Sequence, residues 1–175
     1  MQKKISQLYY FIDEYNYAEL LKLSKNINII YRNYKKNIDI STLISIKNFC
    51  KKNRIKFFIS NNIKLAIKYK LDGVYIPAFN NNLKHLSYSF KKNFKVIGSA
   101  HNLKEIRTKE NQKVEKIVLS SLFKKNKNYL GINKFKLLNN LTKKNIIVLG
   151  GVSQKNLRKL KILKNPDFAG ISFFE

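Results

Sequence analysis

The sequence predicts a (β/α)8 TIM barrel, and three observations favour this fold class. Short apolar runs alternate with amphipathic stretches from one end of the 175-residue chain to the other. The runs are apolar throughout rather than at every second position, which is typical of parallel strands covered on both faces. Eight such units fill the chain at roughly 22 residues each, so the barrel would be a minimal one.

Each unit is an apolar run followed by a stretch with apolar residues at helical spacing. The runs and the helical stretches after them are Leu8–Asp13 with 17–25, Ile27–Asn33 with 40–53, Lys56–Asn61 with 62–70, Gly73–Pro77 with 83–93, Lys95–Ala100 with 102–111, Lys116–Ser121 with 134–145, and Asn145–Val152 with 153–165. The last run is Phe168–Phe174, and the sequence stops at Glu175. We therefore expect the eighth helix to be absent, which would leave one side of the barrel to a partner subunit, an added segment or solvent.

The rival arrangement is an open doubly wound sheet, which would show the same alternation of strands and helices. Eight units, and the lack of a G-x-G-x-x-G motif after the first run, favour the barrel instead. No linker or break in composition divides the chain. The sequence thus predicts one domain over residues 1–175.

The formal charge of +26 invites comparison with nucleic-acid-binding proteins, because Lys and Arg neutralise phosphates. Lys is nevertheless spread through almost every segment, and Arg occurs only at positions 32, 54, 107 and 158. Lys, Asn and Ile are abundant together and all have A/T-rich codons, so genome composition alone would produce this charge. We expect a solvated, Lys-rich surface that attracts small anionic substrates, and not a nucleic-acid-binding protein.

Several classes of protein are excluded or disfavoured by composition. A single cysteine, Cys50, excludes a disulfide framework, and its place on the apolar side of a helical stretch indicates a buried thiol. No apolar run approaches the ~18 residues that span a bilayer, and the start of the chain lacks a signal-peptide pattern. We expect a cytoplasmic protein that does not contact membranes. His85 lies among Lys and Tyr and is expected at the surface.

In a TIM barrel, chemistry is located at the carboxyl ends of the strands and in the loops that follow. Here those ends are polar or small and nearly free of carboxylates; they comprise Arg32, Asn33, Ser60, Asn61, residues 77–80, Ser99 to His101, Ser120, Ser121, Gly150, Gly151 and residues 172–175. The pair Gly150 and Gly151 would let the backbone approach a phosphate closely, although the same dipeptide also serves as a plain turn.

Six segments, in order along the chain, resemble the thiamine-phosphate synthase/TenI family. They are YRNYKK, FFISNNIKLAIKYKLDGVYIP, VIGSAHNLKEI, IVLSSLFKKNKNYLGINKFKLL, IIVLGGVSQKNL and FAGISFF. The resemblance as a whole extends over roughly residues 8–174. The family has the (β/α)8 barrel fold. The resemblance implies a role in thiamine biosynthesis, with small phosphorylated thiazole and pyrimidine compounds as substrates.

The synthases of this family join hydroxymethylpyrimidine pyrophosphate to a thiazole phosphate and release pyrophosphate. The resemblance places Arg32 at the family Arg, and it offers Lys124, Lys125 or Lys127 for the lysine that grips pyrophosphate. Gly150 and Gly151 would take the thiazole phosphate. Ser60 and Ser99 are further candidates for binding substrate.

Magnesium is the cofactor that the synthase resemblance implies, but its ligands are changed. Asn61 and Asn80 stand where the synthases have two Asp, Ser60 stands at a family Asn, and Asn33 replaces a Glu. Amide oxygens can ligate Mg²⁺, but without carboxylates the ion would be held weakly, if at all. Of the groups that handle pyrophosphate in the family, the Arg and a lysine thus have counterparts in this sequence, whereas the metal-binding carboxylates do not.

Two alternatives stay open. A TenI-like thiazole tautomerase would need no metal and would use His101 as the proton carrier, since an imidazole titrates near neutral pH; His101 could equally cap the helix that follows it. The loss of the Asp pair also suits a non-catalytic barrel that binds a ligand or a partner. The sequence does not show whether the protein forms a homo-oligomer.

Overall fold

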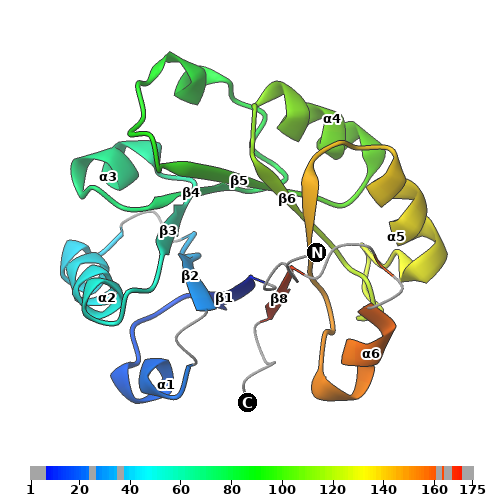
Figure 1. Cartoon of the computed structure of the whole chain (residues 1–175). Coiled ribbons are helices and arrows are strands. Elements are labelled where there is room, and N and C mark those ends of the chain that lie inside the picture. The colour runs from blue at the N-terminus through cyan, green and yellow to red at the C-terminus, as the bar shows by residue number, and fades with distance from the viewer. Residues whose placement is uncertain (1–6, 24–26, 35–37, 161–162, 164–166, 171–175) are drawn as a thin grey trace, which may run out of the picture.

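A computed structural model describes residues 7–23, 27–34, 38–160, 163 and 167–170. Its strands form a closed parallel barrel in sequence order, and the last strand pairs with the first (Figure 1). The strands are β1 (Leu8–Ile12), β2 (Ile27–Tyr31), β3 (Phe57–Ser60), β4 (Gly73–Ile76), β5 (Lys95–Ala100), β6 (Lys116–Leu119), β7 (Asn145–Val148) and β8 (Phe168–Gly170). The predicted (β/α)8 class is confirmed. Residues 171–175 lie outside the described part, as does the expectation that no eighth helix follows.

The strands are buried on both faces, which explains why their sequences are apolar throughout. Inward-pointing side chains form one cluster, comprising Tyr9, Phe11, Ile30, Phe58, Tyr75, Ile97, Val118, Ile147 and Ala169. Outward-pointing side chains pack against the helices in a second and larger cluster. The rings of Phe11 and Tyr75 meet edge to face inside the barrel, with centroids 5.3 Å apart. The middle of the barrel is therefore a packed core.

The helices surround the barrel, and the first four begin at polar caps. They are α1 (Tyr17–Leu21), α2 (Ile40–Lys52), α3 (Ile63–Lys68), α4 (Leu103–Asn111), α5 (Gly131–Asn140) and α6 (Leu157–Leu160), with 3₁₀ turns η1 (Lys84–Ser87) and η2 (Gln154–Asn156). Side chains of Asn16, Asp39, Asn62 and Asn102 accept hydrogen bonds from the first turns of α1 to α4. Hydrogen bonds from Thr42 and Ser41 lower the pKa of Asp39 to about 2.

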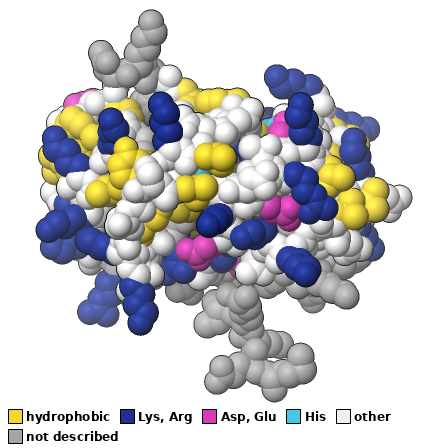
Figure 2. Space-filling view, turned by 90° about the horizontal axis from the view of Figure 1, so that it is seen from above, with side chains coloured by type: hydrophobic (Ala, Val, Ile, Leu, Met, Phe, Trp, Pro, Cys, Tyr) yellow, Lys and Arg dark blue, Asp and Glu magenta, His cyan; other side chains and the backbone are white. Residues whose placement is uncertain are grey.

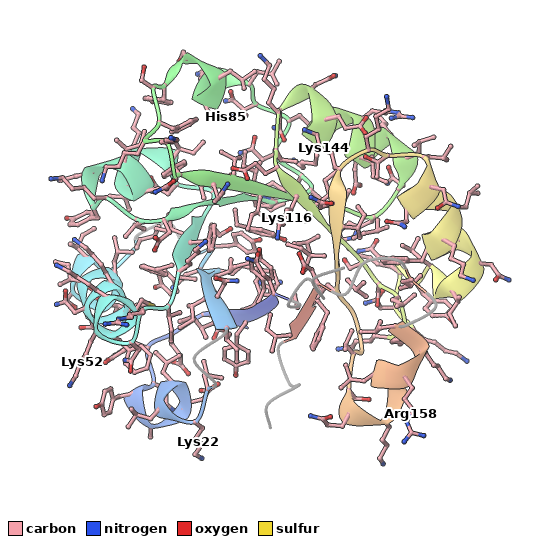
Figure 3. All side chains as sticks on the ribbon, viewed as in Figure 1. Lys22, Lys52, His85, Lys116, Lys144 and Arg158 are labelled. Atoms are coloured by element: carbon pink, nitrogen blue, oxygen red, sulfur yellow. The ribbon has the colours of Figure 1, made fainter. Side chains whose placement is uncertain are left out.

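The connection between β4 and β5 corrects two expectations. The helix expected over residues 83–93 is reduced to the short turn η1, and His85 is buried rather than at the surface, with 3% of its area exposed. The Nε2 atom of His85 lies 2.8 Å from the backbone oxygen of Gln112, where it donates a hydrogen bond. His85 thus fastens η1 to the carboxyl end of α4 (Figure 3).

The amino end of the barrel is held by ion pairs. Lys116 Nζ lies 2.8 Å from Asp167 Oδ2 and 2.7 Å from Gln7 Oε1, and it projects toward the centre of the barrel in Figure 3. Lys95 and Glu115 form a second pair at 2.7 Å. These contacts stabilise the end of the barrel that lies opposite the catalytic loops of such folds.

The face seen in Figure 2 shows lysine and arginine side chains scattered among apolar and polar ones, without a continuous basic stripe. Within the described residues, no helix is long and apolar enough to cross a membrane. Cys50 is buried on α2, as its position in the sequence indicates, and burial raises the pKa of its thiol to about 12.

Candidate active site at the barrel mouth

The floor of the barrel mouth is made of polar side chains that lie two residues beyond the apolar interior cluster. Because side chains alternate along a strand, Ser60, Ser99 and Ser120 point the same way as Phe58, Ile97 and Val118. All three serines are buried. Tyr75, whose pKa is raised by burial, hydrogen-bonds to Ser99, whereas Ser60 Oγ has no hydrogen-bond partner among the described residues.

Arg32 follows β2 and supplies positive charge at this floor. Its guanidinium carbon lies 4.8 Å from the centroid of the Phe11 ring, so the ring face supports the cation. In the part of the chain that the structure describes, no carboxylate forms an ion pair with Arg32. Its charge is therefore available to an anionic ligand.

A cavity of about 260 Å³ opens beside Arg32 at the ends of β6, β7 and β8. Its walls include Ser120, Lys124, Gly150 and Gly151. Lys125 and Lys127 lie on the same loop as Lys124 but do not line the cavity. Of the three lysines suggested for binding pyrophosphate, Lys124 alone lines the cavity formed by the described residues.

Gly150 and Gly151 lie where side chains would not fit. Their φ angles are +105° and +75°, in the region that favours glycine. A Cβ atom on Gly150 would lie 2.2 Å from Ser121 Oγ, and one on Gly151 would lie 2.8 Å from the Lys124 backbone nitrogen. The Gly150 carbonyl accepts hydrogen bonds from the backbone nitrogens of Phe123 and Lys124. The two loops are thereby locked together along the cavity.

His101 lies at the end of β5, and its ring orientation is defined. Its Nδ1 atom lies 3.0 Å from the Ser120 carbonyl oxygen and 3.1 Å from Ser120 Oγ. A carbonyl can only accept, so Nδ1 carries the proton and Nε2 keeps its lone pair. The backbone nitrogen of His101 donates to Glu105, and Asn102, not His101, caps the following helix. The imidazole is thus held in the tautomer that a general base requires.

The family profile described as thiamine monophosphate synthase matches residues 19–172. The chain belongs to this family. The thiamine-phosphate synthase of Prochlorococcus marinus strain AS9601 is 28% identical over 169 residues, which are 90% of this chain and 48% of that protein. The synthase of Pelagibacter ubique is 26% identical over 170 residues, which are 92% of this chain and 81% of the relative.

The chain spans about half the length of the two Prochlorococcus synthases that it matches, 48% and 44%. Among solved structures, thiamine phosphate pyrophosphorylase from Pyrococcus furiosus superposes with a TM-score of 0.73 at 18% identity, covering 95% of this chain and 85% of the other. The enzyme of the same name from Bacteroides thetaiotaomicron gives a TM-score of 0.59 at 10% identity, with 95% and 83% covered. At these identities the likenesses show a shared fold.

Asn61 and Asn80, the two candidate metal ligands suggested by the sequence, are in contact. Asn80 Nδ2 donates to Asn61 Oδ1 at 2.6 Å, and Asn80 Oδ1 accepts from the Asn82 backbone nitrogen. Both amide oxygens are thus already used as acceptors, and neither carries charge. No group of three or more His, Cys, Asp or Glu that could hold a metal occurs among the described residues. The donor set at Asn61 and Asn80 does not fit Mg²⁺ well.

Two buried residues near the mouth were missed by sequence reasoning. Lys109 on α4 is fully buried, and its Nζ donates to the Pro77 carbonyl, the Asn80 carbonyl and Gln112 Oε1 at 2.7 to 2.8 Å. Gln112 Nε2 donates to the carbonyl of Asn80 as well. Burial lowers the pKa of Lys109 to about 8. The sequence could have indicated the burial of Lys109, because it lies three residues after Ile106 and therefore on the same, buried face of the helix.

Two carboxylates lie at the mouth beside Arg32. Asp13 and Glu14 follow β1 and line a second hollow, of about 570 Å³, together with Arg32, Asn33 and Tyr34. Neither carboxylate has a hydrogen bond or ion pair to another described residue. By contrast, Asp72 lies at the amino end of β4 and accepts a hydrogen bond from the backbone of Phe57, which is a structural role.

Proposed function

We propose that this protein is a thiamine-phosphate synthase, which joins hydroxymethylpyrimidine pyrophosphate to thiazole phosphate and releases pyrophosphate. The observation that carries the proposal is the convergence of Arg32, Lys124 and the Gly150–Gly151 backbone on one cavity. Two cations and an open backbone suit two anionic groups bound side by side. Family membership supports the same activity. A cytoplasmic location and a dependence on Mg²⁺ are also part of the proposal, although Asn61 and Asn80 offer the ion no charged ligand.

In the proposed reaction, the thiazole ring nitrogen forms a bond to the methylene carbon of the pyrimidine substrate. The carbon–oxygen bond to pyrophosphate breaks, and the leaving oxygen takes the electron pair. Arg32 and Lys124 stabilise the charge that grows on this oxygen and its phosphates. The loop backbone at Gly150 and Gly151 positions the thiazole phosphate so that the nitrogen faces the methylene carbon.

The test measures thiamine phosphate by chromatography after incubation of both substrates with and without Mg²⁺. We expect Arg32→Gln and Lys124→Met to lower kcat/KM by about a hundredfold, the usual cost of removing a group that stabilises transition-state charge. Lys127→Met is the matched control, since it removes a lysine from the same loop that does not line the cavity. Equal losses in Lys124→Met and Lys127→Met would contradict the assignment. Absence of both turnover and pyrophosphate binding in the wild type would favour a non-catalytic barrel.

A thiazole tautomerase is the second candidate, favoured by the hydrogen bond between His101 Nδ1 and the Ser120 carbonyl. That bond leaves Nε2 free to accept a proton from a thiazole carboxylate phosphate. Isomerisation of this compound, followed by NMR with and without Mg²⁺, tests the role. We expect His101→Gln to abolish it while leaving pyrophosphate binding unchanged. Synthase turnover without any isomerisation in the wild type would remove this candidate.

A further inference from the structure

A cavity of about 200 Å³ lies at the amino end of the barrel, opposite the loops that form the candidate active site. The described residues that line it come from the amino-terminal ends of β1, β3, β5 and β6. None of these residues lines the cavity beside Gly150 or the hollow beside Asp13. The amino-end cavity is therefore separate from the site proposed for the phosphorylated substrates.

The floor of the amino-end cavity is apolar. It is formed by Tyr9, Phe58 and Ile97, which belong to the inward-pointing cluster of the barrel. The ring centroids of Tyr9 and Phe58 lie 6.2 Å apart, with the ring planes tilted by 56°. Gly73 on β4 leaves room for the Phe58 ring, because a Cβ atom there would lie 2.7 Å from that ring. A flat apolar group bound on this floor would remove its surface from water.

The side chains around this floor are polar, which explains why the cavity stays open. Because side chains alternate along a strand, Lys56 points the same way as Phe58, and Lys95 the same way as Ile97. Branched apolar side chains usually fill such a layer of a TIM barrel. Lys56 is exposed and Lys95 is partly exposed. Long side chains of this kind keep their ammonium groups in water and leave space over the floor.

Positive charge exceeds negative charge around the amino-end cavity. Among the described residues, Lys56, Lys95 and Lys116 line it against one carboxylate, that of Glu115. Lys95 pairs with Glu115 at 2.7 Å, and Lys116 pairs with Asp167 at 2.8 Å. The side chain of Lys56 makes no hydrogen bond or ion pair to another described residue. The ammonium group of Lys56 is thus available to an anionic group of a ligand.

Tyr9 is held in place before a ligand arrives. Its hydroxyl donates to Gln7 Oε1 at 3.1 Å and lies 3.4 Å from the Nζ atom of Lys116, which projects toward the barrel centre in Figure 3. Burial, together with the charges of Asp167 and Glu115, raises the pKa of Tyr9 above its usual range, so the hydroxyl stays neutral. The floor is therefore uncharged, and a side chain fixed in advance costs less entropy on binding.

We propose that the amino-end cavity binds a small aromatic carboxylate, with its ring on the apolar floor and its carboxylate paired with Lys56 at the rim. A single negative charge matches the one lysine of the rim that has no partner among the described residues. A phosphate group would bring more negative charge than this lysine balances. Because the cavity lies across the barrel from the candidate active site, such a ligand would bind together with pyrophosphate and not in competition with it.

Calorimetric titration of the whole chain with 2-naphthoate tests this assignment. Three comparison compounds are 2-naphthalenemethanol, which lacks the charge, acetate, which lacks the ring, and 2-naphthyl phosphate, which carries more charge. We expect 2-naphthoate to bind about tenfold more tightly than any of the three. Lys56→Gln should weaken 2-naphthoate about tenfold, the usual effect of losing a hydrogen bond to a charged group, and leave 2-naphthalenemethanol unchanged. Lys52→Gln is the matched control, since Lys52 is an exposed lysine on α2 that does not line the cavity (Figure 3).

NMR spectra and a competition experiment locate the bound ring. Ile97 and Ile147 both belong to the inward-pointing cluster, but only Ile97 lines the amino-end cavity. We therefore expect 2-naphthoate to shift the methyl resonances of Ile97 much more than those of Ile147. Saturating pyrophosphate should not displace 2-naphthoate, and Arg32→Gln should bind it as the wild type does.

Absence of saturable 2-naphthoate binding would overturn this inference and leave the proposed function standing. Displacement by pyrophosphate, or loss of binding in Arg32→Gln, would place the ligand at the barrel mouth and also overturn it. Equal losses in Lys56→Gln and Lys52→Gln would show a general attraction to the basic surface instead of a site. Tighter binding of 2-naphthyl phosphate than of 2-naphthoate would contradict the assignment of a carboxylate.

Discussion

Lys109 is the residue whose removal gives the most informative result on stability. Its ammonium group is fully buried and donates to three oxygens, all of them uncharged. Burial lowers its pKa from 10.5 to about 8, so the folded protein holds the proton less tightly than the unfolded chain does. The change of about 2.5 in pKa corresponds to about 3 kcal/mol, at 1.36 kcal/mol for each unit.

The sign of the pH dependence follows from this direction. Between pH 8 and pH 10.5 the unfolded chain binds the proton that folded Lys109 has released, so the free energy of unfolding should rise with pH in this range. Lys109→Met removes the titrating group and keeps a similar volume. Over this pH range, we expect the free energy of unfolding of the variant to rise by about 3 kcal/mol less than that of the wild type.

At pH 7 the same variant should be about 2 kcal/mol less stable, because the carbonyl of Pro77 and Oε1 of Gln112 lose a buried donor. The assay is urea unfolding followed by circular dichroism at pH 7, 8, 9, 10 and 10.5. Lys104→Met, an exposed lysine on the same helix, controls for the general effect of charge. If the stability curves of the wild type and Lys109→Met run parallel from pH 8 to pH 10.5, the reasoning about the buried ammonium is wrong.

Three other substitutions or reactions probe separate parts of the structure. Gly150→Ala should lower the free energy of unfolding by about 2 kcal/mol and weaken thiazole phosphate binding in calorimetry, because φ is +105° and Cβ would overlap Ser121; unchanged stability would contradict the strain. Asp167→Asn should lower the free energy of unfolding in urea by about 2 kcal/mol, because it breaks the largely buried ion pair with Lys116. The affinity for pyrophosphate should stay the same, and a loss of that affinity would show that the two ends of the barrel are coupled. Cys50 should react with a thiol reagent at least about a hundredfold more slowly than a free thiol until urea is added, since its pKa is raised to about 12 by burial, and rapid reaction in the native protein would refute this.

The strands of this barrel can be predicted from the sequence because a strand buried on both faces is apolar along its length. The structure of the connection from β4 to β5 could not be predicted in the same way. Leu83, Leu86 and Phe90 recur at helical spacing, yet only the short turn η1 forms, while His85 and the loop before it are bound by Gln112 and Lys109. Local periodicity carries no information about partners that lie 27 to 32 residues away.

The candidate site shows the same division. The polar ends of parallel strands must gather at one edge, so Arg32, Ser60 and Ser120 could be placed together from the sequence alone. Which of the lysines after β6 reaches the cavity depends on how that loop folds, and Lys124 is selected by the two hydrogen bonds that its loop makes to Gly150. The sequence also could not predict that the rings of Tyr34 and Phe79 meet edge to face, because this contact depends on the exact path of two loops.

The locking of the loop that carries Lys124 to the Gly150 carbonyl has a consequence for turnover. A cradle that is rigid before substrate arrives holds the pyrophosphate group nearly as well after the bond breaks as before it. Under the proposed function, this product should leave slowly and compete with the pyrimidine substrate. Release of pyrophosphate, rather than formation of the new carbon–nitrogen bond, would then set the rate, and an enzyme that hydrolyses pyrophosphate should speed multiple turnovers in proportion to the product it removes.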